Sequence, residues 1–250
     1  MVYDESLKGR LMIGTPSYSG DVPDLLLPMM YGQKMPQVQF VYNHGCYVDL
    51  NRNEIIRKCY HPQYAERMGG EFTHLLMIDA DAIPLSLDVV EKLLLADKDV
   101  IGGILTYKNT PSNWMVWNWD EEGYDELLMR RIQIADPTAP MAIYEQYKDR
   151  VLEVDAFGFG FALIKREVLD TMESPWFETY EPKDASYKGD DVVFCRKAQD
   201  LGFKIHVHTG AMCAHKDGKY YYPQQTQRVF EGLRAYYNVE LKRQDDEAIQ

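Results

Sequence analysis

The sequence contains little that would indicate a membrane, a secretory route or a polyanionic partner. Apolar stretches such as Leu75 to Ile78 are far shorter than the roughly 20 residues of a bilayer-spanning helix. The N-terminal segment MVYDESLKGR carries acids and no apolar run, so it does not predict a signal peptide. Positive charge is scarce too: 27 Lys and Arg face 39 Asp and Glu, a net charge of −12, which argues against nonspecific nucleic-acid binding. We therefore expect a soluble, cytoplasmic protein without a transmembrane segment.

Cysteine and the common catalytic motifs are also sparse. The four cysteines (Cys46, Cys59, Cys195 and Cys213) have neither C-x-x-C nor zinc-finger spacing, which predicts small buried side chains in a reducing, intracellular compartment. The sequence lacks the P-loop pattern, a G-x-G-x-x-G after a strand, and the G-x-S-x-G of serine hydrolases. Gly158-Phe159-Gly160 is G-x-G only. Its glycines either allow close backbone approach beside a ligand or mark a β-bulge.

What is present is a rhythm of apolar strands and helical segments. The chain has 250 residues, of which 46% are hydrophobic, enough for one large domain or two small ones. Strands are predicted at Leu11–Thr15, Val38–Tyr42, Thr73–Asp79 and Asp99–Tyr107, and helices at Asn51–Met68, interrupted at Pro62, and after a cap at Ser86. Because the Thr73–Asp79 run is almost continuously apolar, we expect it to be buried on both faces. This alternation predicts an α/β fold with a mixed, mostly parallel sheet flanked by helices.

The rhythm breaks at residues 109–150, which predicts an insertion over one end of the sheet. Trp114, Trp117 and Trp119 in this insertion could stack on a bound ligand through their apolar faces or form a core cluster. Further along, short strands are predicted at 151–155, 161–164 and 203–208, a helix at Gly189–Leu201, and a last helix at Gln225–Tyr237.

Three groups of residues carry the candidate chemistry. Asp79-Ala80-Asp81 follows a buried strand, where open α/β sheets bind ligands, and its two carboxylates could share one Mn²⁺ or Mg²⁺ ion; the alternative is a solvated turn. Asp190 and Asp191 open a helix, either as favourable charges at its N-terminus or with one as a general base. His215 follows the strand that contains His206 and His208, which we interpret as structural, and a lone histidine such as His215 is itself often structural.

Together these residues resemble the GT-A glycosyltransferases, the nucleotide-diphosphosugar transferase superfamily. The resemblance covers about Leu11 to His215. Its residues are Thr15-Pro16 with Tyr18, Arg52-Asn53, the strand ending in Asp79-Ala80-Asp81, Pro175-Trp176-Phe177, and Gly189-Asp190-Asp191 followed by Phe194-Cys195, Gly202 and His215. Two features differ from the family: Asp190 stands where Glu is common, and Tyr42-Asn43-His44-Gly45 replaces an acidic uracil-binding pair, for which Asp49 could substitute.

The resemblance implies a role for each residue. Asp81 and His215 would hold a divalent metal, Mn²⁺ or Mg²⁺, and Asp79 would share it or bind the ribose. The nucleoside of a UDP-sugar donor would lie in a pocket lined by Thr15, Pro16, Tyr18, Arg52 and Asn53. Asp191 would act as general base toward a glycan or other hydroxyl acceptor, with Asp190 beside it, which implies inversion of the anomeric centre.

The expected organisation follows. Residues 1–215 would form one GT-A-like catalytic domain: a nucleotide-sugar-binding half at 11–107, the insertion at 109–150 and an acceptor half at 151–215. A helical tail would occupy 216–250. Two other functions stay open, a sugar-nucleotide nucleotidyltransferase and a non-catalytic nucleotide- or carbohydrate-binding module. The first would want a Gly-rich loop with Arg and Lys after strand one, which Gly14-Thr15-Pro16-Ser17-Tyr18 lacks; the second would not need Asp191 and His215.

Overall fold

The computed structural model describes residues 9–18, 37–86, 88–105, 114–118, 149–179, 189–217 and 219–221. Its helices are α2 Val48–Cys59, α3 Pro62–Met68, α4 Val89–Leu95, α7 Arg166–Thr171 and α8 Asp190–Asp200. Its strands are β1 Leu11–Ser17, β2 Val38–His44, β3 His74–Ile78, β4 Ala82–Pro84, β5 Val100–Ile104, β6 Val116–Trp117, β7 Val151–Val154, β8 Ala156–Phe157, β9 Phe161–Lys165, β10 Ile205–Asp217 and β11 Lys219–Tyr221.

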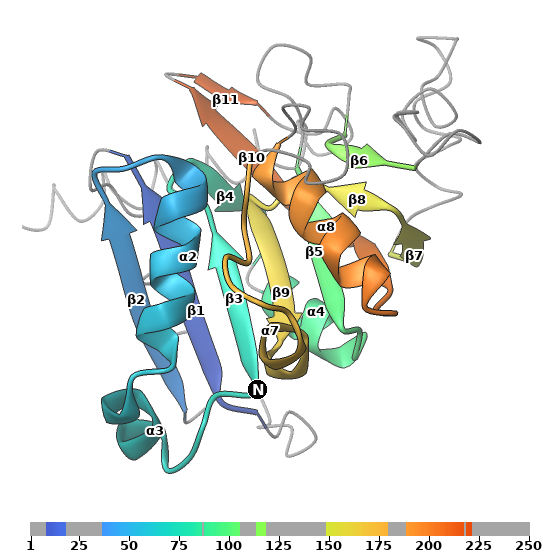
Figure 1. Ribbon diagram of the computed structural model, residues 1–250. Helices are drawn as coiled ribbons and strands as arrows, with labels where there is room; N and C mark the ends of the chain where they lie inside the picture. The colour runs from blue at the N-terminus through green and yellow to red at the C-terminus, as the bar shows by residue number, and fades with distance from the viewer. Residues whose placement is uncertain are drawn as a thin grey trace, which may run out of the picture.

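The described residues form one large sheet with helices on both faces (Figure 1). Its strand order is β2-β1-β3-β9-β5-β10-β11, and β4 and β7 also pair with β10. β1 pairs in parallel with β2 and β3, and β5 with β10, whereas β9 lies antiparallel between β3 and β5. Hence β2, β1, β3, β5 and β10 start in one direction and only β9 of this central group opposes them. The predicted mixed, mostly parallel α/β sheet is confirmed, and the arrangement is compatible with a GT-A-like fold.

The apolar strand β3 explains why the sheet is covered on both sides. Successive side chains of a strand point to opposite faces. Leu75 and Met77 pack into one core cluster together with residues of α2, α7 and α8, while Leu76 and Ile78 pack into the other with residues of α4. All four side chains are fully buried, so the predicted burial on both faces is confirmed.

Local signals set the helix ends. Pro62 stands at the first position of α3, the side chain of His61 accepts a hydrogen bond from the Gln63 amide, and Gly69 closes the helix with a φ of 66°. The predicted break at Pro62 is therefore a boundary between two helices. The expected cap at Ser86 is wrong: Asp88 is the N-cap residue of α4, and the Ser86 hydroxyl donates to the Asp88 carboxylate instead.

The regions predicted to lie outside the core are described only in part. Trp114 is buried and Trp117 packs against the larger core cluster, which favours the core interpretation for these two residues; Trp119 lies outside the described residues. The helical tail expected from residue 216 begins instead as strand, because β10 continues to Asp217 and pairs antiparallel with β11. The helix expected at Gln225–Tyr237 lies outside the described residues, and the proposed domain boundaries stay predictions.

Candidate functional site

The site begins where β3 ends. The Asp79 amide donates a hydrogen bond to the Gly160 carbonyl (3.0 Å), and the Ala82 amide donates to the Asp79 carbonyl (3.0 Å), which closes a turn around Asp79-Ala80-Asp81. Gly160 belongs to the turn between β8 and β9, and the interpretation that these glycines allow close backbone approach beside a ligand stays a prediction. A Cβ on Gly160 would lie 2.4 Å from the Leu105 side chain, so the absence of a side chain lets this turn pack against Leu105.

Asp81 and His215 are brought together by backbone pairing. β4 follows Asp81 directly and pairs antiparallel with β10, with Ala82 opposite His215. The Lys216 amide also donates to the Asp81 carbonyl at 2.7 Å. As a result, His215 Nε2 lies 3.4 Å from Asp81 Oδ2, and the two side chains are 12% and 35% exposed. Of the three predicted metal ligands, Asp81 and His215 lie next to each other and are both partly exposed.

Arg52 occupies the centre of the charged site. It is 3% exposed; its Nη2 donates to both Asp79 carboxylate oxygens (2.9 and 3.0 Å) and its Nη1 donates to Asp190 Oδ2 (2.7 Å). The guanidinium also lies over the rings of Phe177 and Phe159, at 5.4 and 6.0 Å from their centroids. The terminal nitrogens of Arg52 are therefore engaged by carboxylates inside the protein, and its place in a nucleoside pocket stays a prediction.

The side chain of Asn53 is likewise bonded within the protein. Its amide nitrogen donates to the carbonyls of Asp49 (2.9 Å) and Phe177 (2.7 Å), and its oxygen accepts from the amides of Trp176 (2.8 Å) and Phe177 (3.1 Å). These four bonds use the whole capacity of the side chain. Asn53 thus fastens the Pro175-Trp176-Phe177 segment to α2 and has no group left for a ligand.

Asn51 is a site-building residue that the sequence did not reveal. Its side chain donates to the carbonyls of Ser17 (3.2 Å) and Cys46 (2.9 Å) and accepts from the Asn43 side chain (2.8 Å). It therefore ties the ends of β1 and β2 together. Asn51, Arg52 and Asn53 are consecutive, buried and polar, and each holds a different segment around the N-terminal half of α2.

Asp190 and Asp191 open α8 beside Arg52. Asp190 is buried in its ion pair, whereas Asp191 is partly exposed and accepts a hydrogen bond from the Val192 amide at 2.8 Å. Withdrawal from solvent and the negative charge of Asp190 raise the pKa of Asp191 to about 6, although Arg52 opposes the shift. A carboxylate that titrates near neutral pH at the start of a helix is suited to accept a proton.

The predicted three-residue metal set is not assembled as expected. Asp79 is engaged by Arg52, and burial outweighs this partner, so the pKa of Asp79 is raised. Among the residues that the structure describes, no three His, Cys, Asp or Glu side chains are arranged to hold a metal ion. A carboxylate and an imidazole, Asp81 and His215, are nevertheless a donor pair that fits Mn²⁺ when oxygens of a phosphate substrate and water complete the shell.

The predicted nucleoside residues of β1 are placed differently from one another. Thr15 and Pro16 are buried within the strand, which continues to Ser17, and Thr15 Oγ1 has no hydrogen-bond partner within the described ranges. Tyr18 is 82% exposed just beyond the strand. Of these three residues, only Tyr18 exposes its side chain to solvent at this edge of the sheet.

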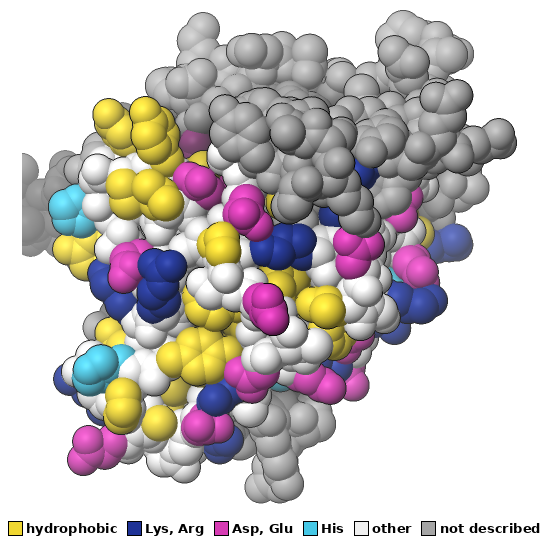
Figure 2. All heavy atoms as spheres, viewed as in Figure 1, with side chains coloured by type: hydrophobic (Ala, Val, Ile, Leu, Met, Phe, Trp, Pro, Cys, Tyr) yellow, Lys and Arg dark blue, Asp and Glu magenta, His cyan; other side chains and the backbone are white. Residues whose placement is uncertain are grey.

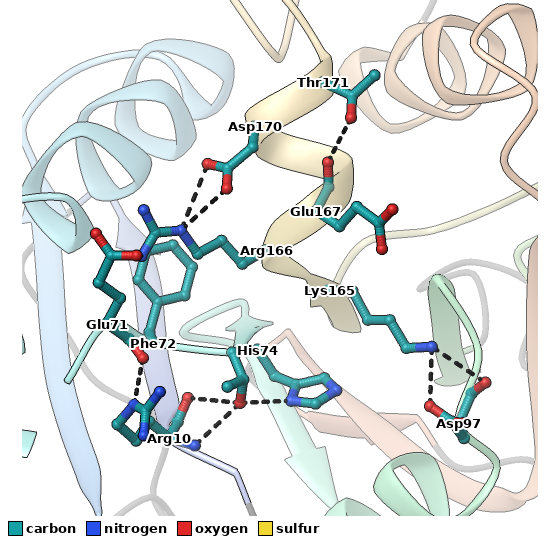
Figure 3. A pocket seen from close by; sticks show the side chains of 11 residues that line it. Arg10, Glu71, Phe72, His74, Asp97, Lys165, Arg166, Glu167, Asp170 and Thr171 are labelled. Carbon is teal, nitrogen blue, oxygen red and sulfur yellow. Dashed lines mark hydrogen bonds and ion pairs between the residues drawn. The ribbon is translucent and has the colours of Figure 1, made fainter.

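A second charged region lies at the opposite edge of the sheet, around the start of β3 (Figure 3). It is a groove of about 560 Å³ in which charged side chains face one another. Arg166 pairs with Glu71 (2.8 Å) and Asp170 (3.1 Å), and Lys165 pairs with Asp97 (2.8 Å). On the face shown in Figure 2, acidic and basic side chains of the described residues are likewise interspersed, without a patch of one sign.

Comparison with known proteins supports the fold. No protein-family model and no curated protein matches this chain. Among solved structures, A197 from STIV is similar with a TM-score of 0.53 at 19% sequence identity, over 86% of this chain and 91% of that one. Identity at this level shows a shared fold alone. Within the described part of the chain, every helix is too short or too polar to cross a bilayer.

Proposed function

We propose that this protein is a metal-dependent glycosyltransferase that moves a sugar from a nucleotide-diphosphosugar, a UDP-sugar, to a hydroxyl acceptor. One observation carries the proposal: the Asp81–His215 pair and the Asp190–Asp191 pair, 134 and 1 residues apart in sequence respectively, both lie at the end of the sheet where β3 finishes, joined through Asp79 and Arg52. Ligands of open α/β sheets bind at this end of the strands.

Asp81 and His215 would hold the divalent cation. A protein of net charge −12 repels a diphosphate, and a bound Mn²⁺ or Mg²⁺ would supply Lewis-acid neutralisation of the leaving nucleotide diphosphate. The two side chains are partly exposed, so they can be reached from outside, and their spacing is set by the pairing of β4 with β10. Their own part is to hold and orient the charged end of the donor.

Asp191 would take the proton of the acceptor hydroxyl. Its Oδ1 is held by the Val192 amide, and its raised pKa places it near the pH at which a base both exists ionised and accepts protons readily. A base that activates the acceptor opposite the leaving group gives inversion. If Asp191 served only to cap α8, a retaining course would be open.

The four free cysteines support placing this reaction in a reducing, intracellular compartment. The acceptor, a glycan or another hydroxyl compound, would approach Asp191.

The test is a panel of nucleotide sugars with Mn²⁺ and glycan acceptors, assayed for nucleotide diphosphate release. We expect release with at least one UDP-sugar, its loss in EDTA, and a fall of about 10²-fold or more in Asp81→Asn and His215→Ala. Asp97→Asn, an exposed carboxylate at the opposite edge, is the matched control and should keep full activity.

The other outcomes are equally informative. Pyrophosphate formation from a nucleoside triphosphate and a sugar phosphate would replace the proposal with a nucleotidyltransferase. Donor binding that is unaffected by EDTA would contradict the metal dependence, and binding without any turnover would indicate a binding module.

A further inference from the structure

Arg52 joins two parts of the chain that carry different halves of the site. Asp79 stands at the end of β3, beside the Asp81–His215 pair, and Asp190 stands at the start of α8, beside Asp191. The guanidinium contacts Asp79 with one terminal nitrogen and Asp190 with the other. No other ion pair to Asp79 or Asp190 occurs among the described residues.

Arg52 offsets the repulsion between the carboxylates that surround it. Three carboxylates, those of Asp79, Asp190 and Asp191, act on one buried guanidinium. Two unbridged carboxylates repel each other strongly where water is largely excluded. Aromatic rings beneath the guanidinium, those of Phe177 and Phe159, restrict its position from the apolar side.

We propose that Arg52 is a positioning residue that fixes Asp79 and Asp190 to each other and thereby sets the placement of Asp191 relative to the Asp81–His215 pair. The expected effect of Arg52 on kcat rests on the proposed function, whereas the link between Asp79 and Asp190 does not. It assigns Arg52 no contact with the nucleoside. Because a planar guanidinium presents two forks in fixed directions, it can serve both carboxylates at once, whereas a lysine ammonium is a single point charge.

The first experiment compares Arg52→Lys with the wild-type chain in the nucleotide-sugar assay. We expect kcat to fall about tenfold or more, while KM for the donor stays within about threefold, because misplacing Asp191 affects the chemical step more than donor binding. Arg57→Lys is the matched control: Arg57 lies on the same helix, is exposed, pairs with Glu54 and should behave as wild type.

The second experiment does not depend on catalysis. Asp79→Asn, Asp190→Asn and the double variant are compared in urea unfolding with the wild type, at pH 7 and without metal. If Arg52 bridges the two carboxylates, the shifts of the unfolding midpoint are non-additive, because the first substitution changes the charge balance felt by the second. The same variants paired with Glu54→Gln, at an exposed position on α2, should give additive shifts.

The results separate the two proposals. Wild-type kinetics in Arg52→Lys would show that charge alone suffices, and a raised donor KM with unchanged kcat would assign Arg52 to donor binding; either overturns the positioning role, as do additive midpoints. If the wild-type chain transfers no sugar yet the midpoints are non-additive, the proposed function fails while the bridge between β3 and α8 stands.

Discussion

The two ends of β3 lie at two charged regions with opposite electrostatic character. At its start, Lys165 and Arg166 are half-buried and pair with the exposed carboxylates of Asp97, Glu71 and Asp170. There the pKa of Asp97 is lowered, chiefly by its hydrogen bond to Lys165, whose pKa is raised in turn despite partial burial.

At the end of β3 the shifts oppose ionisation. The pKa values of Asp79 and Asp191 are both raised, because burial and neighbouring carboxylates outweigh Arg52. At the start of β3, acidic and basic side chains pair with one another. At its end, negative charge is in excess, and an added cation would lower the repulsion between the carboxylates. Such imbalance is typical of a functional site, whereas exposed pairs contribute little to stability.

The largest expected effect is at Asp191. Asp191→Asn should lower kcat by about 10²-fold or more, because the amide oxygen can still accept the hydrogen bond of the Val192 amide but the side chain cannot take up the proton. The same variant should be more stable than the wild type by about 1 to 2 kcal/mol at pH 7, since it removes an unfavourable charge. Enzyme assays and urea unfolding measure the two effects. Near-normal turnover would remove Asp191 as the base.

A smaller effect is expected from pH. In the proposed mechanism ionised Asp191 is the active form, and because its pKa is raised to about 6, kcat/KM should fall about tenfold per pH unit below that value. The folded state binds this proton more readily than the unfolded chain, so the Asp191 contribution to stability declines as pH rises from about 4 to 6 and stays low above. A pH profile that is flat from 5 to 8 would contradict this assignment.

The smallest effect is expected at the opposite edge. Asp97→Asn should change the unfolding free energy by less than about 1 kcal/mol and leave kcat unchanged, because the pair with Lys165 is exposed. Asp97 has a φ of 48°, which asparagine tolerates, so backbone strain does not confuse the result. A large loss of stability, or of activity, would show that the two regions differ less than their burial indicates.

The fold class could be predicted from the sequence because the pattern of apolar residues in a strand indicates which of its faces are buried. The continuous apolar run of β3 predicted burial on both faces, and the Asp-x-Asp after it predicted the edge where the site lies. Local sequence patterns could not predict that β9 is antiparallel or that β10 continues to Asp217. Both features depend on pairing with strands that are distant in sequence.

The site was harder to predict at Arg52 and Asn53. Polar residues in a helix are expected at a surface or facing a ligand, yet these two side chains and Asn51 are turned inward and bonded within the protein. Their partners, Asp190 and Phe177, lie more than 120 residues away in sequence. Only the folded chain shows that this polar run is a scaffold. The signal that was available is the run of four consecutive polar residues, Asn51 to Glu54, before the apolar Ile55 and Ile56.

The backbone ladder between β4 and β10 has one more consequence. It sets the spacing of positions 81 and 215 through main-chain atoms. The side chain at position 215 can therefore be replaced while the backbone geometry stays the same. Exchanging the imidazole for a carboxylate would keep the geometry while shifting preference from Mn²⁺ toward the harder Mg²⁺. Under the proposed function, a single substitution at position 215 would therefore change the metal preference while the pairing of β4 with β10 is kept.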